Sequence, residues 1–156
     1  MCVPLPESVV ARNESISLQQ WVDLWLFYHA TKTSAISERV ASAFAWNIKL
    51  ATSPCFIFFH AIHHSVKPSL GLTIPCSTDK QAQYVLCGII YLGGYHFSAR
   101  IFDDSNIWSY DGRENDGNPL FDAALSDINK LDISCLHGRE AHVYVYSLQN
   151  ADQLQT

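Results

Sequence analysis

The sequence predicts an α+β fold in which N-terminal helices are followed by a mostly antiparallel β-sheet. Helical spacing of apolar residues within 18–46 and apolar runs bounded by turn residues from 55 onward support this order. At 156 residues, 48% hydrophobic and 16% charged, the chain should form one domain with a packed core. We assign residues 1–15 to an extended leader and residues 16–150 to a single domain.

The first helix is predicted over about residues 18–30. Ser17 and Gln20 fit a capping box, in which each residue satisfies a free backbone N–H of the other. The apolar positions at helical spacing are Leu18, Trp21, Val22, Trp25 and Tyr28. We expect this aromatic stripe to pack in the core, with a partner-binding groove as the alternative. A second helix is predicted over about 34–46.

The rest of the chain is predicted to be mainly strands. They are expected near 55–64, 70–76, 83–92, 95–103, 107–111 and 141–148, where apolar runs lie between turn residues. A short helix is predicted over 119–130, after the break at Asn118-Pro119.

A histidine and an aspartate can meet across the hairpin formed by two of these strands. If residues 103–106 form a tight turn in which Asp103 pairs with Asn106, His96 and Asp111 share one face as diagonal neighbours. Their backbones would then lie about 7–8 Å apart. A loop with an odd number of residues would separate them, so the geometry depends on an even loop.

Several patterns in this region belong together. They are an apolar strand, a glycine loop, a His-aromatic pair and a Trp-x-x-aromatic-Asp strand, which stand here as Tyr84-Val85-Leu86, Ile89-Ile90, Gly93-Gly94, His96-Phe97 and Trp108-Ser109-Tyr110-Asp111. This arrangement resembles the C-terminal half of the catalytic domain of ubiquitin-specific proteases. It is most similar to the branch that includes the ubiquitin-specific-peptidase-like SUMO isopeptidase. The resemblance covers about residues 53–148, with low similarity from 113 to 139.

The resemblance implies a partial papain-like cysteine protease fold and assigns roles to individual residues. His96 would be the general base, and Asp111 would orient its imidazole. A loop of Gly93, Gly94 and Tyr95 would lie over the substrate tail, and the aromatic residues supporting the site would be Phe97, Trp108 and Tyr110. The implied partner is ubiquitin or a ubiquitin-like protein such as SUMO. The implied reaction is thiolate attack on the carbonyl that joins its C-terminus to a lysine amine.

The nucleophile of this family is not identified in the chain. The family carries it in a Gly-x-x-Asn-x-Gly-Asn-Thr-Cys-type segment that opens a helix, and no such segment occurs here. Cys2 precedes Val-Pro-Leu-Pro, where a helix cannot begin. The chain would therefore be the His/Asp half of an isopeptidase, inactive alone, whose cysteine comes from a missing N-terminal half. The alternative is a non-catalytic module that binds ubiquitin-like proteins.

Net charge and cysteine content bear on the class of partner and on the cellular compartment. A net charge of −5 argues against a nucleic-acid binder. The five cysteines show no zinc spacing, and they predict a reducing, intracellular compartment, either cytoplasm or nucleus. Cys55 and Cys87 lie in apolar runs and should be buried. We expect no signal peptide, no membrane span and no cofactor.

The His-x-x-His-His cluster at residues 60–64 raises the question of a metal. On a strand, His60 and His64 share one face and His63 points away. Further ligands are not indicated by the sequence, so we expect solvent-facing residues and no metal site.

Overall fold

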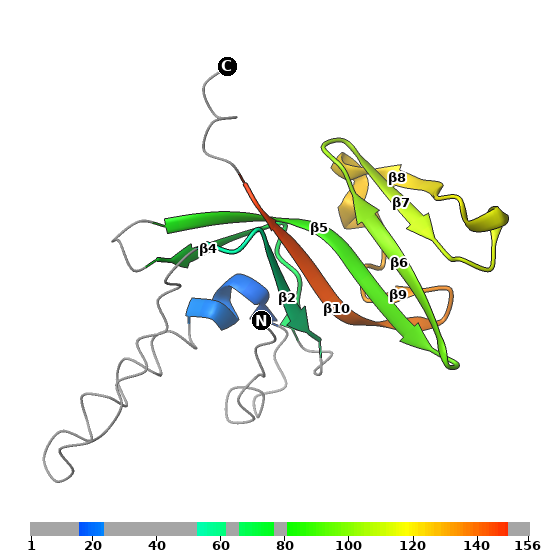
Figure 1. Cartoon of the computed structure of the whole chain (residues 1–156), viewed down its shortest axis with the longest axis horizontal. Helices are drawn as coiled ribbons and strands as arrows, with labels where there is room; N and C mark the ends of the chain where they lie inside the picture. The colour runs from blue at the N-terminus through cyan, green and yellow to red at the C-terminus, as the bar shows by residue number, and fades with distance from the viewer. Residues whose placement is uncertain (1–15, 24–52, 62–65, 77–80, 150–156) are drawn as a thin grey trace, which may run out of the picture.

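The computed structural model describes residues 16–23, 53–61, 66–76 and 81–149, and its main feature is an antiparallel β-sheet (Figure 1). Eight strands form this sheet in the order β2-β10-β5-β6-β7-β8, with β4 on β5 and β9 on β10. These eight strands are β2 (Phe56–His60), β4 (Gly71–Pro75), β5 (Gln81–Gly93), β6 (His96–Phe102), β7 (Asn106–Tyr110), β8 (Leu120–Ala124), β9 (Cys135–Leu136) and β10 (Arg139–Leu148). Two further short strands, β1 (Ile16–Ser17) and β3 (Val66–Lys67), pair in parallel as a separate two-stranded sheet. Short 3-10 helices η1 (Asn115–Gly117) and η2 (Leu125–Lys130) flank β8.

The described residues confirm a mostly antiparallel sheet with few helices. Each predicted strand is found, although the described part of the first one ends at His60. Residues 18–23 are helical, whereas the rest of the predicted first helix, the predicted helix at 34–46 and the leader at 1–15 lie outside the described residues. Among the residues that the structure describes, no helix has the length and apolar character needed to cross a bilayer.

The capping box at the start of the N-terminal helix is confirmed. The backbone N–H of Ser17 donates to Gln20 Oε1 at 2.9 Å, and the backbone N–H of Gln20 donates to Ser17 Oγ at 3.2 Å. These two bonds satisfy donors that the first helical turn leaves free.

The predicted helix over 119–130 is wrong in its first half. Residues 120–124 form β8, which pairs with β7, and only 125–130 are helical, as a 3-10 helix. The reason is tertiary: β8 satisfies the outer edge of β7, whose backbone groups would otherwise have no partner strand. Phe121 also packs edge-on against Trp108, with ring centroids 5.8 Å apart.

The hydrophobic core lies where the N-terminal helix packs on one surface of the sheet (Figure 1). Leu18, Trp21 and Val22 of the helix are buried there. Phe59 links the two layers, since its ring meets Trp21 edge-on at 6.3 Å and Tyr146 at 5.7 Å. The prediction that Trp21 packs in the core is confirmed, and Trp25 and Tyr28 lie outside the described residues.

The hairpin between β6 and β7 has the even loop that the sequence predicts. Phe102 pairs with Ile107, and the N–H of Asp103 donates to the carbonyl of Asn106 at 3.0 Å. Asp103 Oδ1 accepts the N–H groups of Ser105 and Asn106, which fixes the turn. Residues 96 and 111 therefore lie on the same surface of the sheet.

Candidate active site

His96 and Asp111 form a hydrogen-bonded pair at the end of the β5–β6–β7 unit. His96 is the first residue of β6, and Asp111 directly follows β7. The distance between His96 Nε2 and Asp111 Oδ1 is 2.6 Å, which is short for such a bond. Asp111 is buried, whereas the side chain of His96 retains 16% of its exposure. The two residues predicted to be catalytic are thus in direct contact.

The contact with Asp111 identifies which nitrogen of the neutral His96 ring carries the hydrogen. An ionised carboxylate can only accept hydrogen bonds, so Nε2 must donate to Asp111. In the neutral ring, Nδ1 is then the basic nitrogen. Within the part of the chain that the structure describes, no side chain hydrogen-bonds to Nδ1. An imidazole held in this way can accept a proton from a thiol or hydroxyl group placed beside Nδ1.

Backbone donors hold the Asp111 carboxylate in place. The backbone N–H of Arg113 donates to Oδ1 at 2.9 Å, and the N–H of Glu114 donates to the Asp111 carbonyl at 3.0 Å. The Arg113 N–H and then the His96 ring lower the pKa of Asp111, against the opposing effect of burial. The side chain is therefore a carboxylate near neutral pH, as an orienting group must be.

Arg139, at the start of β10, supplies a positive charge to the same carboxylate. Its Nη1 lies 3.1 Å from Asp111 Oδ2, and both side chains are largely buried. The two atoms do not have hydrogen-bond alignment, so their attraction is that of an ion pair. Sequence analysis missed Arg139, because it lies more than 25 residues along the chain from Asp111 and only the pairing of β10 with β5 brings it near.

The loop predicted to cover a substrate tail is a tight hairpin turn. Gly93 pairs with His96, so Gly94 and Tyr95 form the turn, each with φ of 58°. Gly93 packs closely against Arg139, because a Cβ there would lie 3.1–3.2 Å from atoms of Arg139. The side chain of Tyr95 is fully exposed at the tip. The turn is therefore next to the His96–Asp111 pair and open to a ligand.

The predicted aromatic support lies on the other surface of the sheet. Phe97 alternates with His96 along β6, and Tyr110 pairs with Ala99. Trp108 pairs with Ile101 and donates its Nε1–H to Asp103 Oδ2 at 2.7 Å. The structure does not bring these three rings against the imidazole.

A buried arginine network lies further along the same surface as the pair. Arg100 donates Nε–H to Asp122 Oδ2 at 2.7 Å and Nη1–H to the carbonyls of Asp132 and Cys135 at 2.6 and 3.1 Å. Burial raises the pKa of Tyr91 to about 12, so its phenol stays protonated. This phenol donates to the carbonyl of Ile133 and accepts from Arg100. The network ties the segment before β10, and hence Arg139, to the sheet.

No cysteine among the described residues is bonded to His96. Cys76 follows β4, whose end pairs with Gln81, and Cys55 precedes β2 near the same end of β5. That end lies about 40 Å along the strand from Gly93. The thiol of Cys87 donates to the backbone carbonyl of Val145, and the backbone carbonyl of Cys135 accepts a hydrogen bond from Arg100. The expectation that Cys55 is buried is wrong, since its residue is exposed before β2 begins.

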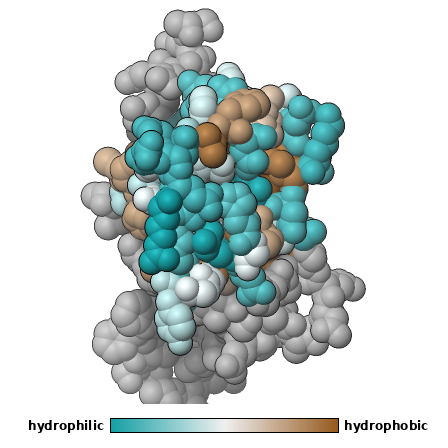
Figure 2. Space-filling view, turned by 90° about the vertical axis from the view of Figure 1, so that its right-hand side faces the viewer, coloured by the Kyte–Doolittle hydropathy of each residue, from teal (hydrophilic) through white to brown (hydrophobic). Residues whose placement is uncertain are grey.

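The surface at the end of the molecule that carries β6, β7 and β8 is mainly polar (Figure 2). Seen from this end, most exposed residues are hydrophilic, with smaller apolar patches between them (Figure 2). Asp111, Glu114 and His137 place ligand atoms within 4.8 Å of one another. A cation there would compete with the guanidinium of Arg139 for Asp111, so we assign no metal to this group.

Comparison with known proteins adds no relative to this description. The sequence matches no protein-family model, and no curated protein matches it either.

Proposed function

We propose that this chain is the His/Asp half of a cysteine-type isopeptidase that cleaves ubiquitin-like C-termini from lysine. The observation that carries the proposal is the 2.6 Å bond between His96 and Asp111, with Nδ1 left as the basic nitrogen. A base with a carboxylate that orients it is the part of a thiol hydrolase that activates the nucleophile. The proposed fold is the corresponding part of a papain-like protease domain.

The tight turn beside the His96–Asp111 pair leaves room for an extended substrate tail. Gly93 and Gly94 carry no side chains, so the backbone of an incoming Gly-Gly terminus can approach closely. The exposed ring of Tyr95 then lies where it can cover that tail. The remaining ubiquitin-like surface would bind outside the described turn.

The proposed reaction needs a cysteine that the described residues do not place at His96. His96 would accept the thiol proton at Nδ1, and Asp111 would stabilise the resulting imidazolium. The thiolate would attack the isopeptide carbonyl, the lysine amine would leave with a proton from the imidazolium, and water would hydrolyse the acyl-enzyme. The cysteine would come from a separate N-terminal half, so the chain alone should be inactive.

Binding is the direct test of the substrate class. Ubiquitin and SUMO would each be titrated into the ¹⁵N-labelled chain, with tail-truncated forms lacking the terminal Gly-Gly as matched controls. We expect the amide signals of Gly93 and Gly94 to shift with the intact proteins and to remain unchanged with the truncated ones. Failure of both proteins to bind would contradict the proposed substrate class.

A second candidate is a non-catalytic module that binds the same proteins. The separation of the described cysteines Cys55 and Cys76 from His96 favours it, because a thiol that does not reach His96 cannot pass its proton to that imidazole. Ubiquitin and SUMO carrying a C-terminal electrophile distinguish the two functions. Labelling of one cysteine that is lost in His96→Ala would establish an enzyme, and turnover by the chain alone would disprove its predicted inactivity. Binding without labelling, even after an N-terminal half is supplied, would establish the module.

A further inference from the structure

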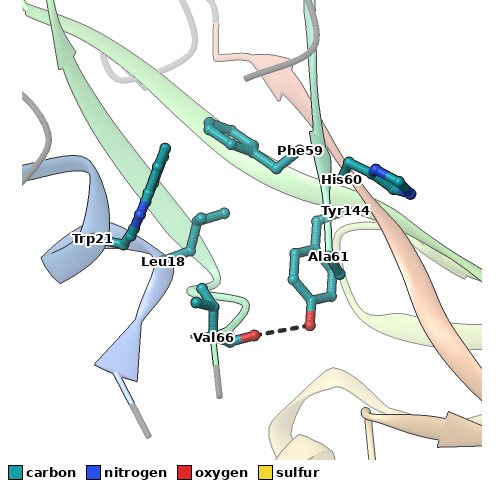
Figure 3. Close-up of a pocket in the computed structure, with 7 residues that line it drawn as sticks. All are labelled: Leu18, Trp21, Phe59, His60, Ala61, Val66 and Tyr144. Carbon is teal, nitrogen blue, oxygen red and sulfur yellow. Dashed lines mark hydrogen bonds between the residues drawn. The ribbon is translucent and has the colours of Figure 1, made fainter. Parts of the chain in front are cut away.

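Two histidines distant in sequence meet on neighbouring strands, outside the candidate active site. His60 ends β2, and His142 lies in β10, which pairs with β2. Their Nε2 atoms are 3.0 Å apart, and their ring centroids are 4.3 Å apart at an interplanar angle of 82°. Figure 3 shows the His60 ring turned away from the apolar side chains of Leu18 and Trp21. The two rings therefore form a separate polar site at the edge of the core.

The backbone around these histidines fixes their positions. His60 pairs with Val143, and the N–H of Ala61 donates to the carbonyl of His142 at 2.8 Å. Nearby, the Tyr144 hydroxyl donates to the carbonyl of Val66 (Figure 3). The backbones of both imidazoles are thus hydrogen-bonded side by side, and a ligand would meet two neighbouring nitrogens.

The separation of the nitrogens matches two ligands of one metal ion. With metal–nitrogen bonds of about 2.0–2.1 Å, ligands at 90° are about 2.9 Å apart and tetrahedral ligands about 3.3 Å apart. The observed 3.0 Å lies near the first value. The 3.0 Å separation is also that of an N–H···N hydrogen bond, so the choice of ion rests on the affinity order of nitrogen sites, which rises through Ni²⁺ to Cu²⁺ and falls at Zn²⁺.

We propose that His60 and His142 form a two-imidazole chelate for a divalent transition-metal ion, with Cu²⁺ and Ni²⁺ preferred to Zn²⁺. Water would complete the coordination of the ion. The sequence indicated no metal because it shows His60 beside His63 and His64 but gives no sign of His142. The pairing of β2 with β10 supplies that ligand from 82 positions along the chain.

The proton balance of binding is simple. In the absence of a metal, one Nε2–H donates to the other Nε2, so one ring carries its proton at Nε2. Metal binding needs both Nε2 lone pairs, and that proton moves to Nδ1 of the same ring.

The test is a Ni²⁺ titration of the full chain, followed by calorimetry and by the midpoint of thermal unfolding. Ni²⁺ is chosen because free thiols reduce Cu²⁺, and a Cys55→Ser background removes as a competing ligand the one thiol that is exposed among the described cysteines. We expect one ion per chain, a raised unfolding midpoint, and weaker binding with Zn²⁺. His60→Gln and His142→Gln should each lower the Ni²⁺ affinity at least about tenfold, since glutamine keeps polarity but loses the imidazole.

Matched controls separate this site from other histidines. His137→Gln changes an exposed histidine of the β9–β10 turn and should leave binding unchanged. The double variant His63→Ala/His64→Ala should also retain it, although these residues neighbour His60 in sequence. Binding that survives His142→Gln, or that is lost with His63 and His64, would overturn the proposal. These readouts do not depend on ubiquitin-like proteins, so they are independent of the proposed function.

Discussion

One surface of the sheet has two ends of different character, and β10 passes through both. At one end, the N-terminal helix covers Phe59, Tyr144 and Tyr146, and packing is apolar. At the other end, the described residues bury charged groups instead, namely Asp111 and Arg100, with His96 half-buried beside them. The first end buries apolar side chains, and the second buries charged side chains that are paired with one another.

The two ends also differ in how many hydrogen-bond partners each buried polar group has. In the apolar core, each tyrosine hydroxyl finds one backbone carbonyl, as Tyr144 does with Val66 and Tyr146 with Ser69. At the polar end, single groups serve several partners, and Arg100 alone contacts Asp122, Tyr91 and two carbonyls. Substitutions should therefore act through lost packing at one end and through unpaired charge at the other.

The largest loss of stability should come from Phe59→Ala in the apolar core. Phe59 is 5% exposed and joins Trp21 to Tyr146, so truncation should cost about 3–5 kcal/mol through lost burial and a cavity. Phe58→Ala is the matched control, since Phe58 is the preceding residue on β2 but is 42% exposed. Urea denaturation of both variants measures the effect. Similar losses for the two would contradict the assignment of the core to one surface.

At the polar end, Arg100→Met should destabilise the protein by about 3 kcal/mol. The change removes the cation and leaves Asp122, Tyr91 and the carbonyls before β10 without their donor. Arg113→Met is the control, because its side chain is exposed and such changes usually cost less than about 0.5 kcal/mol. Guanidinium denaturation compares the two. An unchanged free energy of unfolding in Arg100→Met would show that the network contributes little net stability.

The features that the sequence predicted correctly depend on residues close together along the chain or on one short loop. The capping box at Ser17 and the even loop at Asp103 depend on residues three positions apart, where side chains and backbone meet whatever the rest of the chain does. The contact of His96 with Asp111 followed from that loop by strand parity alone.

The missed features depend on contacts between distant segments. β8 replaced a predicted helix because pairing with β7 outweighs local propensity. Arg139 and His142 gained their partners through the pairing of β10 with β5 and β2, which no local pattern specifies. The prediction also treated Phe97, Trp108 and Tyr110 as neighbours of the site, although the parity that joins His96 to Asp111 turns these rings to the other surface.

A smaller effect is expected at the turn beside the site. Gly94→Ala should cost about 1 kcal/mol, because φ of 58° is the left-handed region that alanine disfavours, while the space around a new Cβ is open. Gly94→Asn should cost less, since asparagine tolerates this conformation. Thermal unfolding of the two variants tests this. Equal stability of the wild type and Gly94→Ala would mean that the turn adopts another conformation in solution.

The smallest expected effect concerns the ionisation of Asp111. Its pKa is lowered, so the folded protein holds this proton less tightly than the unfolded chain does. The stabilisation is therefore complete above the ordinary carboxyl pKa of about 4 and is lost as the pH falls through the lower pKa of the folded state. NMR titration of the Asp111 carboxyl carbon should give a midpoint below the ordinary value. In His96→Ala the midpoint should rise only partly, because the N–H of Arg113 remains as the main donor. A midpoint that does not move in His96→Ala would show that the imidazole and the carboxylate do not meet in solution.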